Sequence, residues 1–163
     1  MNILIVDDDY NKINNIIVDL IKQDPSNKVR YTTDYEQAVT FIMDNKEYID
    51  LIILDWCFPP NSWSRSKYAM GRQVINNMKL SNIDIKTIIC SSDVINIDKE
   101  EYPFVLGAIT YCEGLDVGKY IYSFLDKPKE KEDEYIGQPK VLKKIKEDTG
   151  YRRKKSSTPW WIK

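Results

Sequence analysis

Residues 49–59 read Ile-Asp-Leu-Ile-Ile-Leu-Asp-Trp-Cys-Phe-Pro, an apolar run that ends in one carboxylate and a turn. The run Leu51–Leu54 is too short for a helix, and its unbroken hydrophobicity is typical of a strand buried on both faces of a parallel sheet. Asp55 would then stand at the carboxyl end of that strand, the edge where open α/β sheets bind their ligands. Taken alone, Asp55 could equally cap the turn that follows it.

A second run of the same kind begins the chain. Asn2–Val6 is apolar and β-branched, and it ends in Asp7, Asp8 and Asp9. Adjacent carboxylates repel one another unless a cation neutralises them, and Mg²⁺ takes one or two carboxylates together with water. If the two strands are neighbours, Asp7 or Asp8 would meet Asp55 at one edge of the sheet. Asp9 could equally serve only as the N-cap of the next helix.

The remaining pattern alternates strands with amphipathic helices. Apolar residues recur at helical spacing within 11–23, and further helices are predicted for 34–45, for the segment after Gly71 and for 117–126. Short strands are predicted at 28–33, 85–90 and 105–112. This alternation indicates a parallel sheet with right-handed crossovers.

Composition limits the possible classes of protein. The chain has 163 residues, 42% of them hydrophobic, and a formal net charge of −1, which gives no electrostatic bias toward nucleic acid or membrane. Neither a transmembrane stretch nor a signal peptide is recognisable. Three cysteines without paired spacing suit a reducing cytoplasm. Because the chain contains no histidine, a histidine nucleophile, base or metal ligand is excluded.

Three motifs together resemble a response-regulator receiver domain. They are Ile-Leu-Ile-Val-Asp-Asp at 3–8, Ile-Leu-Asp-Trp-Cys-Phe-Pro at 53–59 and Ile-Ile-Cys-Ser-Ser-Asp at 88–93. The resemblance covers residues 1–126 and implies an α/β, flavodoxin-like, doubly wound sheet of five parallel strands in the order 2-1-3-4-5, with helices on both faces. Residues 127–163 are expected to form a charged linker, a short helix and a basic, aromatic tail.

The resemblance also implies a function and a metal site. The chain would be a stand-alone, cytoplasmic receiver of a two-component system, in which Asp55 accepts a phosphoryl group from a histidine kinase or phosphotransfer protein. Mg²⁺ would be held by Asp7, Asp8, Asp55 and the backbone carbonyl of Cys57. We expect no enzymatic activity beyond self-phosphorylation from a donor and autodephosphorylation.

Two further residues receive roles from the same resemblance. Ser91 would hydrogen-bond the phosphoryl group, for which a hydroxyl is suited because phosphate needs donors. Tyr111 would be the switch residue of the fifth strand, or simply part of the core. A downstream protein would read the switched face, and no membrane is involved.

The chain departs from the family at the fifth strand. Receivers end this strand in Lys-Pro, whose ammonium contacts the phosphoryl group, whereas Glu113-Gly114 stands near that place here. A Lys-Pro pair at 127–128 would fit only if the fifth strand lay much later, so we favour 105–112. Loss of the cation would slow phosphorylation. A phosphorylation-independent pseudo-receiver that acts as a docking module is therefore the alternative.

A haloacid-dehalogenase-type phosphohydrolase is a more distant alternative. It would use Asp7 as the nucleophile and Asp9 as the general acid, with Ser91 as its hydroxyl residue. No late strand ends in paired acids, and this hypothesis leaves Asp55 without a role.

Three segments fit the family pattern poorly. The loop 59–70 is unusually long, and Trp63, Arg65 and Lys67 could make it a docking lip over the site, or it could be a surface insertion. Residues 93–104 lack a helical stripe and contain Pro103, so any helix there should be short or irregular. In the tail, the basic and aromatic residues of 152–161 could bind nucleic acid or dock on protein.

Overall fold

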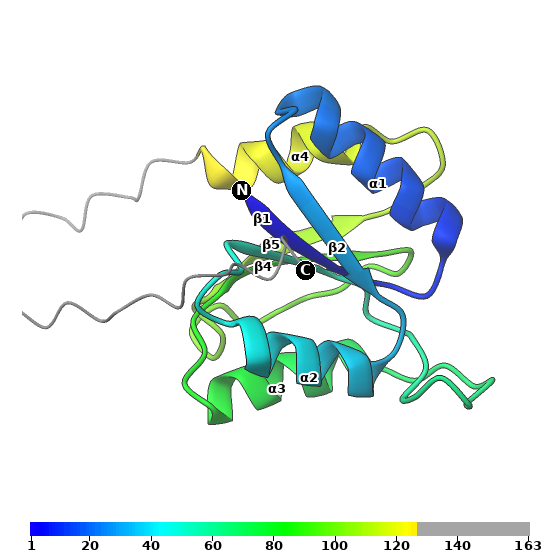
Figure 1. Ribbon diagram of the computed structural model, residues 1–163, viewed down its shortest axis with the longest axis vertical. Coiled ribbons are helices and arrows are strands. Elements are labelled where there is room, and N and C mark those ends of the chain that lie inside the picture. The colour runs from blue at the N-terminus through cyan, green and yellow to red at the C-terminus, as the bar shows by residue number, and fades with distance from the viewer. Residues whose placement is uncertain (127–163) are drawn as a thin grey trace, which may run out of the picture. The chain divides into compact units, whose positions relative to one another are not determined.

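Five parallel strands form one sheet in the order β2-β1-β3-β4-β5 (Figure 1). The computed structural model describes residues 1–126, so the predictions for the tail lie outside the described residues. The strands are β1 (Asn2–Val6), β2 (Lys28–Thr32), β3 (Leu51–Leu54), β4 (Lys86–Ser91) and β5 (Val105–Thr110). The predicted sheet and strand order are confirmed, and the fifth strand lies where the sequence placed it.

Helices cover both faces of the sheet. Helices α1 (Tyr10–Gln23) and α4 (Val117–Leu125) lie together on one face, and α2 (Tyr35–Asn45) and α3 (Met70–Leu80) lie on the other (Figure 1). Every residue of β3 is buried, as expected for a central strand covered on two sides. Between the sheet and the pair α1 and α4 lies a core of Ile3, Ile5, Ile13, Ile16, Leu20, Leu51, Ile53, Ile88, Cys90, Ile109, Val117 and Ile121.

The connection from β4 to β5 contains no helix within residues 92–104, where the sequence predicted at most a short or irregular one. Instead, Tyr102 and Phe104 are buried and pack edge to face, with ring centroids 6.3 Å apart. The Tyr102 hydroxyl donates to Asn76 Oδ1 at 2.5 Å, and Lys79 Nζ lies 5.0 Å from the centre of the Tyr102 ring. Tyr102 therefore holds this segment against α3.

The long loop 59–70 projects away from the sheet and its helices (Figure 1). Its base is closed by a reciprocal pair of backbone hydrogen bonds between Phe58 and Tyr68, at 3.1 and 3.2 Å. Phe58 is fully buried and anchors this pairing. The loop ends where α3 begins, and Gly71 is required there because a Cβ atom would lie 2.5 Å from the Asp55 carbonyl oxygen.

No helix within residues 1–126 has the length and apolarity needed to cross a membrane.

Candidate functional site

The carboxylates predicted from the sequence meet at one edge of the sheet. Val6 and Leu54 are paired in the register of β1 and β3, so Asp7 and Asp55, which follow them, lie side by side. The Asp55 N–H donates to the Val6 carbonyl at 2.8 Å and continues the pairing. Oxygens of Asp7, Asp8 and Asp55 lie within 4.8 Å of one another.

Asp9 has a different task from its two neighbours. Its carboxylate caps α1 and accepts hydrogen bonds from the N–H groups of Asn11 at 2.9 Å and Lys12 at 3.3 Å. A cap of this kind satisfies backbone donors that have no partner within the helix. It also fixes where α1 starts, and therefore where the side chain of Lys12 points.

Lys12 is the residue of the site that the sequence analysis missed. Its ammonium lies 2.7 Å from Asp7 Oδ2, 2.7 Å from Asp55 Oδ1 and 2.6 Å from the Cys90 carbonyl oxygen. The side chain is only 4% exposed, and the ammonium lies 5.4 Å from the centre of the Tyr111 ring. A buried cation is therefore built into the acidic edge.

Burial and pairing shift the pKa values of this cluster. Burial raises the pKa of Asp7 to about 6, although the charge of Lys12 lowers it and that of Asp55 raises it further. Burial lowers the pKa of Lys12, but the charges of Asp7 and Asp55 and the hydrogen bonds to both outweigh burial, so that the pKa is raised overall. Lys12 therefore stays charged at neutral pH, and Asp7 takes up a proton more readily than an exposed aspartate would.

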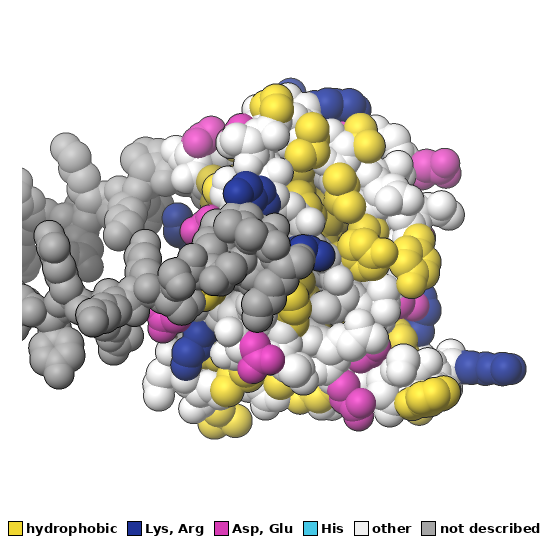
Figure 2. Space-filling view, in the orientation of Figure 1, with side chains coloured by type: hydrophobic (Ala, Val, Ile, Leu, Met, Phe, Trp, Pro, Cys, Tyr) yellow, Lys and Arg dark blue, Asp and Glu magenta, His cyan; other side chains and the backbone are white. Residues whose placement is uncertain are grey.

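A second cation comes from the long loop. Lys67 Nζ lies 2.8 Å from Asp8 Oδ2, although the lysine side chain is 55% exposed. The bond to Asp8 raises the pKa of Lys67. Trp63, in contrast, is 90% exposed, and Figure 2 shows hydrophobic and basic side chains at the end of the projecting loop. Part of the loop thus reaches the site, while its tip faces solvent.

The carboxylates fit a divalent cation chemically. Three carboxylates within 4.8 Å of one another form the oxygen donor set that hard cations such as Mg²⁺ take. Asp7, Asp8 and Asp55 are the residues that would hold such an ion. Binding would have to compete with Lys67 for Asp8, because that ammonium already lies against one of its oxygens.

The other predicted residues lie near this edge, and their roles stay predictions. Ser91 ends β4 and is buried, and its hydroxyl accepts a long hydrogen bond of 3.4 Å from the Asp93 N–H. The Ser91 carbonyl accepts from the Tyr111 N–H at 2.7 Å. The Cys57 N–H donates to Asp55 Oδ2 at 3.1 Å, which fixes the orientation of that carboxylate.

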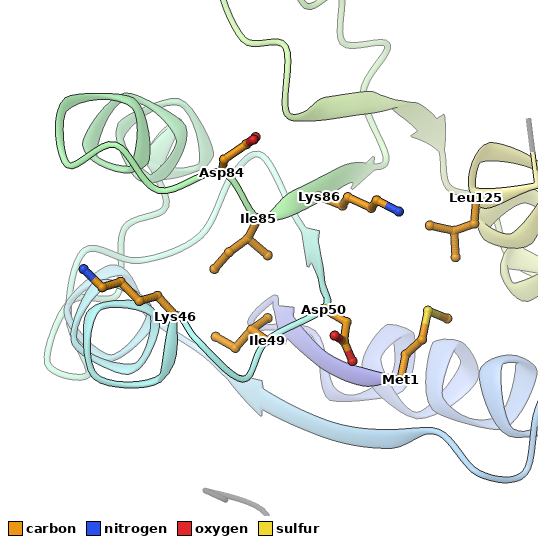
Figure 3. Close-up of a pocket in the computed structure, with 8 residues that line it drawn as sticks. All are labelled: Met1, Lys46, Ile49, Asp50, Asp84, Ile85, Lys86 and Leu125. Carbon is orange, nitrogen blue, oxygen red and sulfur yellow. The ribbon is translucent and has the colours of Figure 1, made fainter. Parts of the chain in front are cut away.

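A hollow of about 640 Å³ lies at the opposite edge of the sheet (Figure 3). Met1, Asp50 and Lys86 in its wall stand at the amino ends of β1, β3 and β4. Ligands of open α/β sheets bind at the carboxyl ends of strands. We therefore assign the candidate site to the carboxylate cluster and not to the hollow.

No family model matches the chain, and no curated protein matches it in sequence. Solved structures do resemble it. The phosphorylated cyanobacterial phytochrome response regulator RcpA is 24% identical, with a TM-score of 0.55 over 76% of this chain and 89% of its own. The response regulator TrrA from Thermotoga maritima, in complex with Mg²⁺ and BeF, is 18% identical, with a TM-score of 0.55 over 76% of this chain and 97% of its own.

A CheY-like receiver domain protein from Methanospirillum hungatei is 20% identical, with a TM-score of 0.51 over 77% of this chain and 93% of its own. All three similarities cover about three quarters of this chain and most of the length of the similar structure. Residues 1–126 of this chain therefore have the fold of a response-regulator receiver domain.

Proposed function

We propose that the chain is a cytoplasmic signalling receiver that accepts a phosphoryl group on Asp55 and passes the signal to a protein partner. The observation that carries this proposal is the meeting of Asp7, Asp8 and Asp55 at the carboxyl edge of a receiver-like sheet. Asp55 lies at the centre of this edge, is 8% exposed and is held on both oxygens, by Lys12 and by the Cys57 N–H.

In the proposed reaction the Asp55 carboxylate attacks the phosphorus of a phosphohistidine on a kinase or phosphotransfer protein. A new P–O bond forms as the P–N bond breaks, and the electron pair stays on the histidine nitrogen. Mg²⁺ held by Asp7, Asp8 and Asp55 would offset negative charge on the phosphoryl oxygens. The donor must be another molecule, since this chain has no histidine.

The output would run through the ends of β4 and β5. We assign to the Ser91 hydroxyl a hydrogen bond to the new phosphoryl group. The Ser91 carbonyl accepts a hydrogen bond from the Tyr111 N–H at 2.7 Å, so a shift of Ser91 would also displace the backbone of Tyr111. A downstream protein that contacts this face would then distinguish the two states.

A pseudo-receiver that only docks is the second candidate, and one observation favours it. Each of the three carboxylates already has a lysine partner. Lys12 forms ion pairs with Asp7 and Asp55, and Lys67 forms one with Asp8. In such a cluster every carboxylate has a cationic partner without any ligand. The hydrolase hypothesis loses support, because the proposed general acid Asp9 is engaged as a helix cap.

The test is the intact mass of the full chain after incubation with Mg²⁺ and phosphoramidate, beside the variants Asp55→Asn and Asp7→Asn. A gain of one phosphoryl group that is absent in Asp55→Asn supports the receiver. Donor turnover that survives Asp55→Asn but is lost in Asp7→Asn would favour the hydrolase. Neither adduct nor turnover would leave the docking module as the better hypothesis.

A further inference from the structure

Lys12 occupies a position that ordinary helix packing would give to an apolar residue. It stands one turn before Ile16 on the face of α1 that carries Ile13 and Leu20 into the core. Lysine is almost never fully buried unless it is paired, because removing its charge from water is costly. Such a placement calls for a specific reason, and the contacts of the ammonium supply one.

The ammonium is fully coordinated by three elements of the sheet edge. It donates to Asp7 after β1, to Asp55 after β3 and to the Cys90 carbonyl within β4, all at 2.6–2.7 Å. An ammonium group has three donors, so its hydrogen-bonding capacity is used completely. The Tyr111 ring, 5.4 Å away, lies close to the same group. The cation is thus held at a fixed point against one oxygen of the proposed phosphoryl acceptor.

The charge balance shows what this cation would do during the reaction. The carboxylates of Asp7, Asp8 and Asp55 with the ammonium groups of Lys12 and Lys67 have a formal sum of −1. An aspartyl phosphate carries nearly two negative charges in place of one, so the sum becomes about −2. Without Lys12 it would be about −3 at a largely buried edge. A bound Mg²⁺ would change these two sums to about 0 and −1, so only the site with Lys12 would be neutral. A cation placed in advance where charge develops is the arrangement that accelerates phosphoryl transfer.

We propose that Lys12 is a catalytic residue of the phosphoryl transfer to Asp55, and that its ammonium moves from the carboxylate oxygen onto a phosphoryl oxygen. This inference rests on the proposed function. It also explains how a receiver can work although Glu113-Gly114, and no lysine, stands near the place after β5 where receivers have Lys-Pro. The first turn of α1 delivers the cation that the fifth strand lacks.

The experiment compares wild-type chain with Lys12→Met and with the matched control Lys22→Met. Lys22 lies on the same helix and is also paired with an aspartate, Asp19 at 3.2 Å, but its side chain is 65% exposed. The first readout is the initial rate of mass gain with phosphoramidate and Mg²⁺. The second is the equilibrium affinity for beryllofluoride, a phosphoryl mimic, measured by ¹⁹F NMR. Circular dichroism establishes that each variant is folded.

We expect Lys12→Met to be phosphorylated about 100-fold more slowly, as for removal of one preorganised donor, and to bind beryllofluoride at least about tenfold more weakly. Lys22→Met should match wild type in both. If Lys12→Met does not fold, Lys12→Gln, which keeps N–H donors but not the charge, replaces it in both measurements. Rates and affinities within threefold of wild type would overturn the assignment of Lys12 while leaving the receiver function intact. A wild-type chain that gains no phosphoryl group would refute the proposed function itself, and Lys12 catalysis with it.

Discussion

Lys67 should weaken metal binding, because its ammonium already lies 2.8 Å from the Asp8 oxygen that an incoming cation needs. With the lysine side chain 55% exposed, the pair is screened by solvent and should be worth about 0.4–1 kcal/mol. A divalent ion must displace or repel this charge. Replacing Lys67 with Gln should therefore strengthen Mg²⁺ binding about two- to fivefold, since 1.4 kcal/mol corresponds to a factor of ten.

Isothermal titration calorimetry of Mg²⁺ into both proteins measures this difference. The matched control is Lys79→Gln, which removes the same charge from a similarly exposed lysine at the far end of α3, paired with Glu101 at 3.5 Å. The gain should appear only in Lys67→Gln and should shrink at high salt. An equal gain in both variants would show that only net charge matters, and no gain in either would refute competition at Asp8.

Three further predictions concern stability and reactivity. Asp7→Asn should raise the free energy of unfolding at pH 7 by up to about 3 kcal/mol, because burial raises the pKa of Asp7 from 3.8 to about 6 and each unit is worth about 1.4 kcal/mol. The Asp7 carboxyl binds its proton more tightly in the folded chain than in the unfolded chain. The stability gained by Asp7→Asn should therefore be complete above about pH 6 and lost below about pH 4. Urea unfolding that shows the same gain in stability at every pH would contradict this reasoning. Gly71→Ala should cost roughly 1–3 kcal/mol, since its Cβ would lie 2.5 Å from the Asp55 carbonyl oxygen, and an unchanged thermal midpoint would mean that the helix start can move. The Cys90 thiol, buried and with its pKa raised by burial to about 12, should resist iodoacetamide until the chain unfolds, whereas exposed Cys112 should react at once; mass spectrometry that finds both labelled at equal rates would show that the edge opens readily.

The sheet and its acidic edge could be predicted because each depends on local pattern. Leu51–Leu54 can be buried on both sides only in a covered parallel strand, and Asn2–Val6 repeats that pattern. Once the two strands are neighbours, the residues that follow them must meet, so Asp7 and Asp55 were found without knowledge of any contact.

Lys12 escaped prediction because a lysine near a helix start is ordinarily exposed. The available signal was its spacing from Ile16 and Leu20, which puts a charge within the buried stripe of α1. The sequence analysis considered the loop 59–70 as a lip over the site but could not predict the contact of Lys67 with Asp8. The path of that loop is set by the pairing of Phe58 with Tyr68 and not by a local pattern. The irregular segment before β5 was predicted from Pro103, but the burial of Tyr102 was not.

The contacts of Lys12 also have a consequence for how the chain folds. Its partners Asp55 and the Cys90 carbonyl lie 43 and 78 residues away in sequence, so the ammonium meets them only after β1, β3 and β4 have assembled. Until then α1 carries an unmatched charge on the face that must enter the core, which disfavours early docking of that helix. The contacts of Lys12 can therefore form only when β1, β3 and β4 are aligned, so we expect α1 to pack on the sheet late in folding.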